Sequence, residues 1–154
     1  MKKRKQWVIL GGVLAAVALI IGTSWYTYKK NNNKKWSMIY IPKTEDGTND
    51  FWTSLISGTR MAAQECNVSL EILAPEREQD VERQRELLEK AIEKNPDAIL
   101  ISPSSFDALD GLLEKAKKNK ISITFIDSYT ENNIQDLTVA TDNLEAGKIL
   151  GEYA

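Results

Sequence analysis

The sequence predicts an α/β fold in which a parallel sheet of strand order 2-1-3-4-5 carries helices on both faces, preceded by one transmembrane helix. Three observations support this prediction. From residue 36 onward, short strand-like runs alternate strictly with longer amphipathic segments, which favours parallel strands joined by helical crossovers. Residues 98–101 are four consecutive apolar residues, a pattern typical of a strand covered on both faces. Residues 7–28 contain no charged residue, which predicts the membrane span.

The N-terminal part divides into a basic cytoplasmic tail (1–6), a transmembrane helix or signal anchor (7–28) and a polar linker (29–35). About 20 apolar residues in a helix suffice to cross a bilayer. Trp7 and Trp25 lie near the two ends of the span, as expected for aromatic residues at membrane interfaces. A buried soluble helix is the alternative, but nothing else in the chain is large enough to surround it.

Orientation of the span is not decided by charge alone, because four basic residues precede it and four follow it. The short N-terminus directly before the apolar run resembles an export signal, which places the folded domain outside the cytoplasm. The cleavage site is poor, so we favour an uncleaved anchor over a removed signal. We therefore expect a single-pass cell-membrane protein with an extracellular or periplasmic domain.

The first half of the domain begins with a predicted strand at residues 36–41, which stops at Pro42. A helix is predicted at residues 50–65 and a second strand at 68–73. The apolar side of that helix is expected to comprise Phe51, Leu55, Ile56, Thr59 and Ala62. The next helix is predicted at residues 80–94 and ends at Asn95-Pro96. Its apolar side is expected to comprise Val81, Leu87, Leu88, Ala91 and Ile92.

The second half contains predicted strands at residues 97–102, 121–126 and 137–140. Ser104 or Ser105 is expected to cap a helix that runs to Asn119. The apolar side of this helix is expected to comprise Phe106, Leu109, Leu112, Leu113 and Ala116. A last helix is expected to begin near Asp142 or Asn143 and to continue at Ala154.

Composition restricts the chemistry of the domain. Residues 36–154 carry twelve basic and twenty-two acidic residues, and such an acidic body disfavours nucleic-acid binding. The chain has no His, which removes Ser-His and Cys-His catalytic pairs and most transition-metal sites. Cys66 is the only cysteine, and we interpret it as a small buried hydrophobe on a helix. A nucleotide enzyme would need a Gly-rich loop after the first strand, where residues 42–50 contain only Gly47. We expect no enzyme activity, no cofactor and no metal.

Ligands of such sheets bind beyond the carboxyl ends of the strands, near the point where the strand order reverses. The loops at residues 42–52, 102–105, 127–129 and 141–143 meet this condition. The candidate ligand-binding residues in these loops are Asn49, Phe51, Trp52, Asp127, Asp142 and Asn143. Carboxylates and amides can bond the hydroxyls of a neutral polyol, and aromatic rings can cover the C–H face of its ring.

Several of these residues have a purely structural alternative. Asp50 is interpreted as the N-cap of its helix. Asn49 also suits a turn, and Phe51 and Trp52 also suit the core. Either Asp142 or Asn143 fits a helix cap better than a ligand contact. A ligand role is favoured for Asp127, because it is a carboxylate at the end of a strand.

Five short segments follow one another in a recognisable order. They are Tyr40-Ile41-Pro42-Lys43, Thr48-Asn49-Asp50-Phe51-Trp52, Pro96-Asp97-Ala98-Ile99-Leu100-Ile101-Ser102-Pro103, Phe125-Ile126-Asp127, and Thr141-Asp142-Asn143 leading to Ala146-Gly147. In these segments the chain resembles the type 1 periplasmic-binding-protein family, the ribose- and galactose-binding-like proteins of sugar transporters. The resemblance implies a Rossmann-like lobe that binds a sugar or similar polyol.

The resemblance also implies roles for single residues. Asn49 and Phe51 match a pair that bonds sugar hydroxyls and stacks on the sugar ring, and Trp52 matches a second aromatic residue. Asp127 matches a carboxylate that accepts sugar hydroxyls, while Asp142 and Asn143 match the crossover into a second lobe. Three departures argue against ribose itself. Asp50 stands where the family often has Pro, Ser128 stands where it often has Arg, and the loop before Asn49 is a few residues longer than in ribose binders.

The resemblance assigns residues 36–141 to the N-terminal lobe of a solute-binding domain and 142–154 to the start of a truncated second lobe. It implies the substrate-binding component of an ABC-type sugar transporter, with a membrane permease as partner. A membrane-tethered sugar sensor that partners a two-component histidine kinase is the alternative. The sensor domain of a transcription regulator is a weaker candidate, because an apolar span occupies the place of its helix-turn-helix. Family members close two lobes around the ligand, so a single lobe is expected to bind weakly or not at all.

Overall fold

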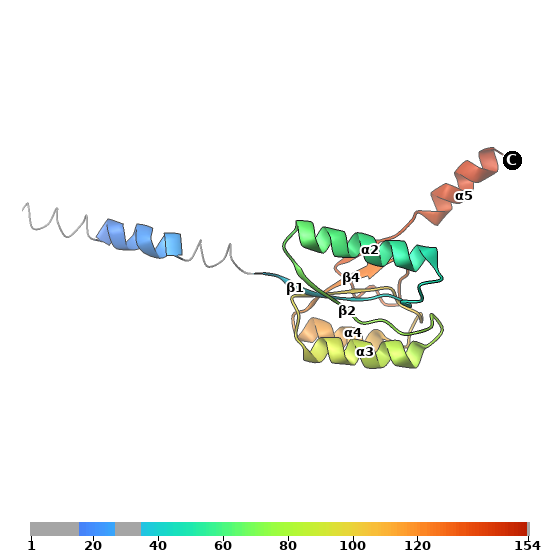
Figure 1. The fold of residues 1–154 in the computed structure, drawn as a ribbon, viewed down its shortest axis with the longest axis horizontal. Coiled ribbons are helices and arrows are strands. Elements are labelled where there is room, and N and C mark those ends of the chain that lie inside the picture. Colours follow the sequence, from blue (N-terminus) through green and yellow to red (C-terminus); the bar gives the residue numbers. More distant parts are fainter. Residues whose placement is uncertain (1–15, 27–34, 154) are drawn as a thin grey trace, which may run out of the picture. The chain divides into compact units, whose positions relative to one another are not determined.

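The computed structural model describes residues 16–26 and 35–153 (Figure 1). Residues 16–26 form a helix. Within the described ranges, no helix is long and apolar enough to cross a membrane. The predicted basic tail, most of the predicted linker and both ends of the predicted span at residues 7–28 lie outside the described residues. The span therefore stays a prediction.

The sheet contains five strands in the order β2-β1-β3-β4-β5, which confirms the predicted topology. The strands are β1 (Ser37–Ile41), β2 (Ser69–Ile72), β3 (Ala98–Ile101), β4 (Ser122–Ile126) and β5 (Leu137–Val139). Every neighbouring pair is parallel. The chain leaves β1 toward β2 on one side and returns to β3 on the other, so the strand order reverses at β1. Because all strands run the same way, the loops that follow them share one edge of the sheet.

The helices cover both faces of this sheet. Helix α2 (Asp50–Glu65) lies on one face, and α3 (Val81–Glu93) and α4 (Asp110–Lys118) lie on the other (Figure 1). The larger core lies between the sheet and these last two helices, and includes Ile39, Ile41, Leu88, Ile92, Ile99, Ile101, Leu113, Ile123 and Phe125. A smaller core of Tyr40, Ile56 and Ile126 includes a residue of α2. The last helix, α5 (Asn143–Glu152), has no buried residue.

Two predictions for α2 are wrong. Its buried residues are Trp52 and Ile56, whereas Phe51 and Ala62, both expected on the apolar side, are exposed. The N-cap is Asn49 rather than Asp50, because the Asn49 Oδ1 atom accepts hydrogen bonds from the backbone N–H groups of Phe51 and Trp52.

The interpretation of Cys66 as a buried residue is also wrong, since its side chain is exposed. Cys66 is the C-cap of α2 and lies beyond the last helical turn. Cys66 still lines an apolar hollow together with Met38 of β1 and Leu70 of β2.

Helix α4 begins at Asp110, and not at Ser104 or Ser105 as predicted. The preceding loop has its own hydrogen bonds. Ser105 Oγ accepts a bond from the N–H of Ala108 at 3.2 Å, and the N–H of Ser104 donates to Gln84 Oε1 at 2.9 Å. A serine side chain that bonds nearby backbone groups offers the chain an alternative to the helix. Phe106 therefore lies outside α4 and is exposed.

Gln84 connects the loops at the carboxyl edge to α3. It is fully buried, and its Nε2 atom donates to the carbonyl oxygens of Pro42 at 3.3 Å and Ser102 at 2.9 Å. Its Oε1 atom accepts from Ser104, as described above. The loops after β1 and β3 are thus held by one side chain. The sequence analysis missed Gln84, although a polar residue three positions after Val81 and four before Leu88 interrupts an apolar stripe.

Tyr40 lies beside this connection, at the carboxyl end of β1. Its ring is fully buried, and its hydroxyl is 3.2 Å from Ser102 Oγ. Burial raises the pKa of the Tyr40 hydroxyl to about 12, and the negative charge of Asp127 acts in the same direction. The hydrogen bond with Ser102 opposes this increase in the pKa but does not offset it. The neutral hydroxyl is therefore the stable form well above neutral pH.

Replacing Gln84 with Leu should destabilise the protein by about 2–3 kcal/mol, because two carbonyl groups and one N–H would stay buried without their partner. Urea unfolding of the full chain measures this change. Gln64→Leu, on the exposed side of α2, is the matched control and should change the free energy of unfolding by no more than about 0.5 kcal/mol. Equal effects of the two substitutions would contradict the role of Gln84.

Tyr40 should make stability depend on alkaline pH. In the unfolded chain Tyr40 loses its proton near the ordinary value of 10.0, whereas in the folded protein it keeps the proton until about pH 12. The folded state then binds more protons over this interval, so stability should fall as pH rises from about 10 to about 12. The fall should be smaller in Tyr40→Phe and unchanged in Tyr129→Phe, an exposed control. Urea unfolding at pH 9 to 12 tests this, and identical slopes in wild type and Tyr40→Phe would refute it.

Candidate ligand-binding site

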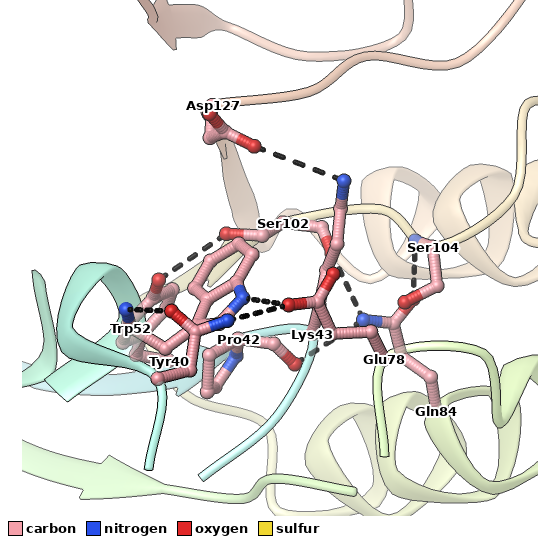
Figure 2. A network of polar contacts seen from close by, with 10 residues as sticks. Tyr40, Pro42, Lys43, Trp52, Glu78, Gln84, Ser102, Ser104 and Asp127 are labelled. Carbon is pink, nitrogen blue, oxygen red and sulfur yellow. Dashed lines mark hydrogen bonds and ion pairs between the residues drawn. The ribbon is translucent and has the colours of Figure 1, made fainter. Parts of the chain in front are cut away.

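The predicted edge brings together charged and aromatic side chains from three elements (Figure 2). Lys43 follows β1, Asp127 follows β4, and Trp52 lies in the first turn of α2. The Lys43 Nζ atom is 3.7 Å from Asp127 Oδ2 and 5.9 Å from the centroid of the Trp52 ring. Lys43 therefore links two candidate residues that are far apart in the sequence.

Asp127 is placed by an unusual backbone conformation. Its φ angle is +71°, in the left-handed region that Asp and Asn tolerate better than other side chains. Its N–H donates to the carbonyl of Val139 at 2.9 Å, which pins the turn to β5. The side chain remains 39% exposed and carries a charge at the rim.

A carboxylate that the sequence analysis missed organises the first loop. Glu78, in the loop between β2 and α3, accepts hydrogen bonds at its Oε1 atom from Asn49 Nδ2 at 3.1 Å and from Trp52 Nε1. The four candidate loops selected from the sequence left out the loop after β2, although this loop also starts at the carboxyl edge of the sheet, beside β1. The side-chain amide of Asn49 thus caps α2 through its oxygen and meets Glu78 through its nitrogen.

The two adjacent aromatic residues of this loop differ in exposure. Trp52 is 3% exposed and Phe51 is 52% exposed. Their rings meet edge to face, with centroids 4.9 Å apart and an interplanar angle of 84°. Phe51 is therefore the ring with a surface available to a ligand, while Trp52 supports it from the core.

A second aromatic pair lies in the loops after β3 and β4. Phe106 and Tyr129 are 54% and 63% exposed, and their ring centroids are 6.1 Å apart. The N–H of Glu131 donates to the Phe106 carbonyl at 2.7 Å, which joins the two loops. The sequence analysis did not select either residue for the site. The position of Tyr129, two residues after Asp127, was the signal available.

Asp142 and Asn143 are exposed and do not join the Lys43–Asp127 group. Asp142 is the N-cap of α5, since its Oδ1 atom accepts from the N–H of Glu145 at 2.9 Å. This confirms the interpretation of Asp142 as a helix cap. In the described part of the chain, no hydrogen bond or ion pair connects either residue with Lys43 or Asp127.

The chemistry of this edge suits hydrogen bonding to a neutral molecule. Two carboxylates, Glu78 and Asp127, accompany one ammonium group, Lys43, so the local charge is slightly negative. Among residues 16–26 and 35–153, no group of three or more acidic or cysteine side chains is arranged to hold a metal ion. Carboxylate acceptors, lysine and amide donors and an exposed ring are the groups that bind hydroxyls and a C–H face.

Comparison with known proteins gives consistent results. Residues 40–154 match the periplasmic binding protein domain family. The ribose import binding protein of Bacillus subtilis (strain 168) is 24% identical over 129 residues, which are 84% of this chain and 41% of that protein.

Solved structures resemble the fold and part of the sequence. A sugar transporter protein from Clostridium phytofermentans is 41% identical, with a TM-score of 0.72 over 76% of this chain and 43% of that chain. A carbohydrate transporter solute binding protein from Agrobacterium radiobacter, in complex with D-arabinose, is 30% identical, with a TM-score of 0.69 over 78% of this chain and 40% of that chain.

The chain spans about two fifths of the length of the relatives that it matches. The matched region begins within β1 and includes every later strand and helix of the sheet domain. The parallel topology of the sheet agrees with a family match over most of the sequence. The chain belongs to the periplasmic binding protein family.

Proposed function

We propose that residues 36–141 are the N-terminal lobe of an extracytoplasmic binding protein for a neutral sugar, and that residues 142–154 begin a second lobe. The observation that carries this proposal is the group formed by Lys43, Asp127 and the Asn49–Trp52 turn at the carboxyl edge of the sheet. The D-arabinose complex of one relative and the ribose import function of another support a sugar as ligand.

Each group has a defined task in this proposal. Asp127 accepts hydrogen bonds from ligand hydroxyls, and Lys43 and the Asn49 amide donate to hydroxyl oxygens. The exposed face of Phe51 covers the C–H side of the sugar ring. The exposed Asp127 carboxylate disfavours an anionic ligand, because a second negative charge would lie close to it.

Ligand affinity should be weak in this chain alone. The chain spans about two fifths of its relatives, so the residues that would close over the opposite side of the ligand are not part of this lobe. A half-enclosed sugar keeps much of its hydration, and the dissociation constant should be on the order of millimolar.

The proposed protein partner is inferred from the family to which the chain belongs. We propose delivery of the sugar to an ABC-type permease at the membrane, with residues 7–28 as the anchor that holds the domain outside the cytoplasm. A membrane-tethered sensor for a histidine kinase is the second candidate. The observation that favours it is that no cysteine for lipid attachment lies between the uncharged run at residues 7–28 and Cys66.

Titration of the ¹⁵N-labelled full chain with D-arabinose or D-ribose should shift the amide signals of Phe51, Trp52 and Asp127 in a saturable way. Asp127→Asn should weaken this binding at least about tenfold, because it removes a charge-assisted acceptor. Asn tolerates the left-handed backbone of this position, so the variant changes charge without backbone strain. NMR detects millimolar binding and locates it.

Two controls sharpen this test. Glu114→Gln removes a carboxylate from the exposed side of α4 and should leave the affinity unchanged. Galacturonate, an anionic sugar, should bind about tenfold more weakly than galactose, its neutral counterpart. Shifts that appear only away from the carboxyl edge, or none with any neutral pentose or hexose, would refute the proposed function.

A further inference from the structure

Two loops that the sequence separates are fastened together at the candidate site. The Thr44 hydroxyl donates to the carbonyl of Glu76 at 2.9 Å, and the N–H of Glu45 donates to the carbonyl of Pro75 at 3.2 Å. Thr44 is only 2% exposed, so the first of these bonds is buried at its donor. The loop after β2 is thereby held against the loop after β1, with Glu78 at its far end.

A single oxygen of the Glu78 carboxylate accepts hydrogen bonds from two side chains near the start of α2. Asn49 Nδ2, 29 positions before Glu78, donates to Oε1. Trp52 Nε1, 26 positions before Glu78, donates to the same oxygen (Figure 2). An indole has one N–H, so this bond determines the rotation of the buried Trp52 ring. Because Phe51 meets that ring edge to face, the orientation of the exposed Phe51 ring depends on it as well.

The same oxygen also decides which way the Asn49 amide points. Its Oδ1 atom is used by the backbone N–H groups at the start of α2, and one N–H of Nδ2 is used by Glu78. The remaining amide hydrogen is the group that Asn49 can offer to a ligand. Asn49 is thus fixed as a donor to the ligand rather than an acceptor.

We propose that Glu78 is a positioning residue of the sugar site, which sets the orientation of the Trp52 indole and of the Asn49 amide without itself contacting the sugar. The part of this inference that concerns ligand affinity rests on the proposed function. The part that concerns orientation can be tested on the ligand-free chain.

The orientation test uses the indole N–H signal of Trp52 in the ¹⁵N-labelled full chain, assigned by its loss in Trp52→Phe. Glu78→Ala should move this signal and speed its exchange with solvent about tenfold, because the acceptor is removed. Glu78→Gln keeps an oxygen acceptor and should restore most of the wild-type signal. Glu76→Ala removes an equal charge two positions away and leaves its backbone carbonyl in place, so it should change neither property.

The ligand test measures the affinity of the same variants for D-arabinose. Glu78→Ala should lose about tenfold and Glu78→Gln no more than about threefold. An unchanged indole signal in Glu78→Ala, or an equal change in Glu76→Ala, would overturn the positioning role. A displaced indole with wild-type affinity would overturn its link to binding.

Failure of the proposed function gives a different result. In that case wild type would show no saturable sugar shifts, while the indole signals of the Glu78 variants would still decide the orientation. If Glu78→Ala does not fold, Glu78→Met replaces it, because Met fills a similar volume without a carboxylate acceptor. Glu78→Met should then move the Trp52 indole signal, and Glu76→Met should not.

Discussion

Parallel pairing of β1 with both of its neighbours is the constraint on which this site depends. β1 pairs with β2 along one edge and with β3 along the other, in the same direction. The chain must therefore cross the sheet on one face with α2 and on the opposite face with α3, and both crossings start from the same edge. The loops that follow β1, β3 and β4 therefore start from the same edge of the sheet. The backbone topology alone therefore brings these loops to the edge where ligands of such sheets bind.

Buried polar contacts convert that meeting of loops into a defined surface. Gln84 holds the backbones after β1 and β3, and Tyr40 meets Ser102 directly beneath. A buried amide with all its groups bonded is stable only in one arrangement of its partners. The raised pKa of the Tyr40 hydroxyl reflects the same environment, because burial favours the neutral form near Asp127. The loops after β1 and β3 are therefore held by buried hydrogen bonds that involve no ligand.

The charged and aromatic residues of this edge fall into two groups, those that hold other side chains in place and those that are exposed to solvent. Trp52 and Glu78 belong to the first group, since Trp52 is buried and Glu78 accepts hydrogen bonds from the side chains of Asn49 and Trp52. Phe51 and Asp127 belong to the second group, since both remain partly exposed at the edge of the sheet. Lys43 contacts one residue of each group, the Asp127 carboxylate and the Trp52 ring. Such an arrangement is expected at a binding site, because an exposed side chain keeps one orientation toward a ligand only when neighbouring side chains restrict its rotation.

The sequence by itself determined the elements and their order, because these depend on local patterns. Alternating strand and helix signals predicted the topology, the four apolar residues of β3 predicted a central strand, and Asp127 was correctly placed directly after β4. Only the tertiary structure decided which of Phe51 and Trp52 is buried, where α4 begins, and that Glu78 and Gln84 hold the loops. The physical reason is distance along the chain. Periodicity in α2 is compatible with either Phe51 or Trp52 on the apolar side, and packing against the sheet selects Trp52 and Ile56. A bond between residues 26 positions apart leaves no local signature in the sequence.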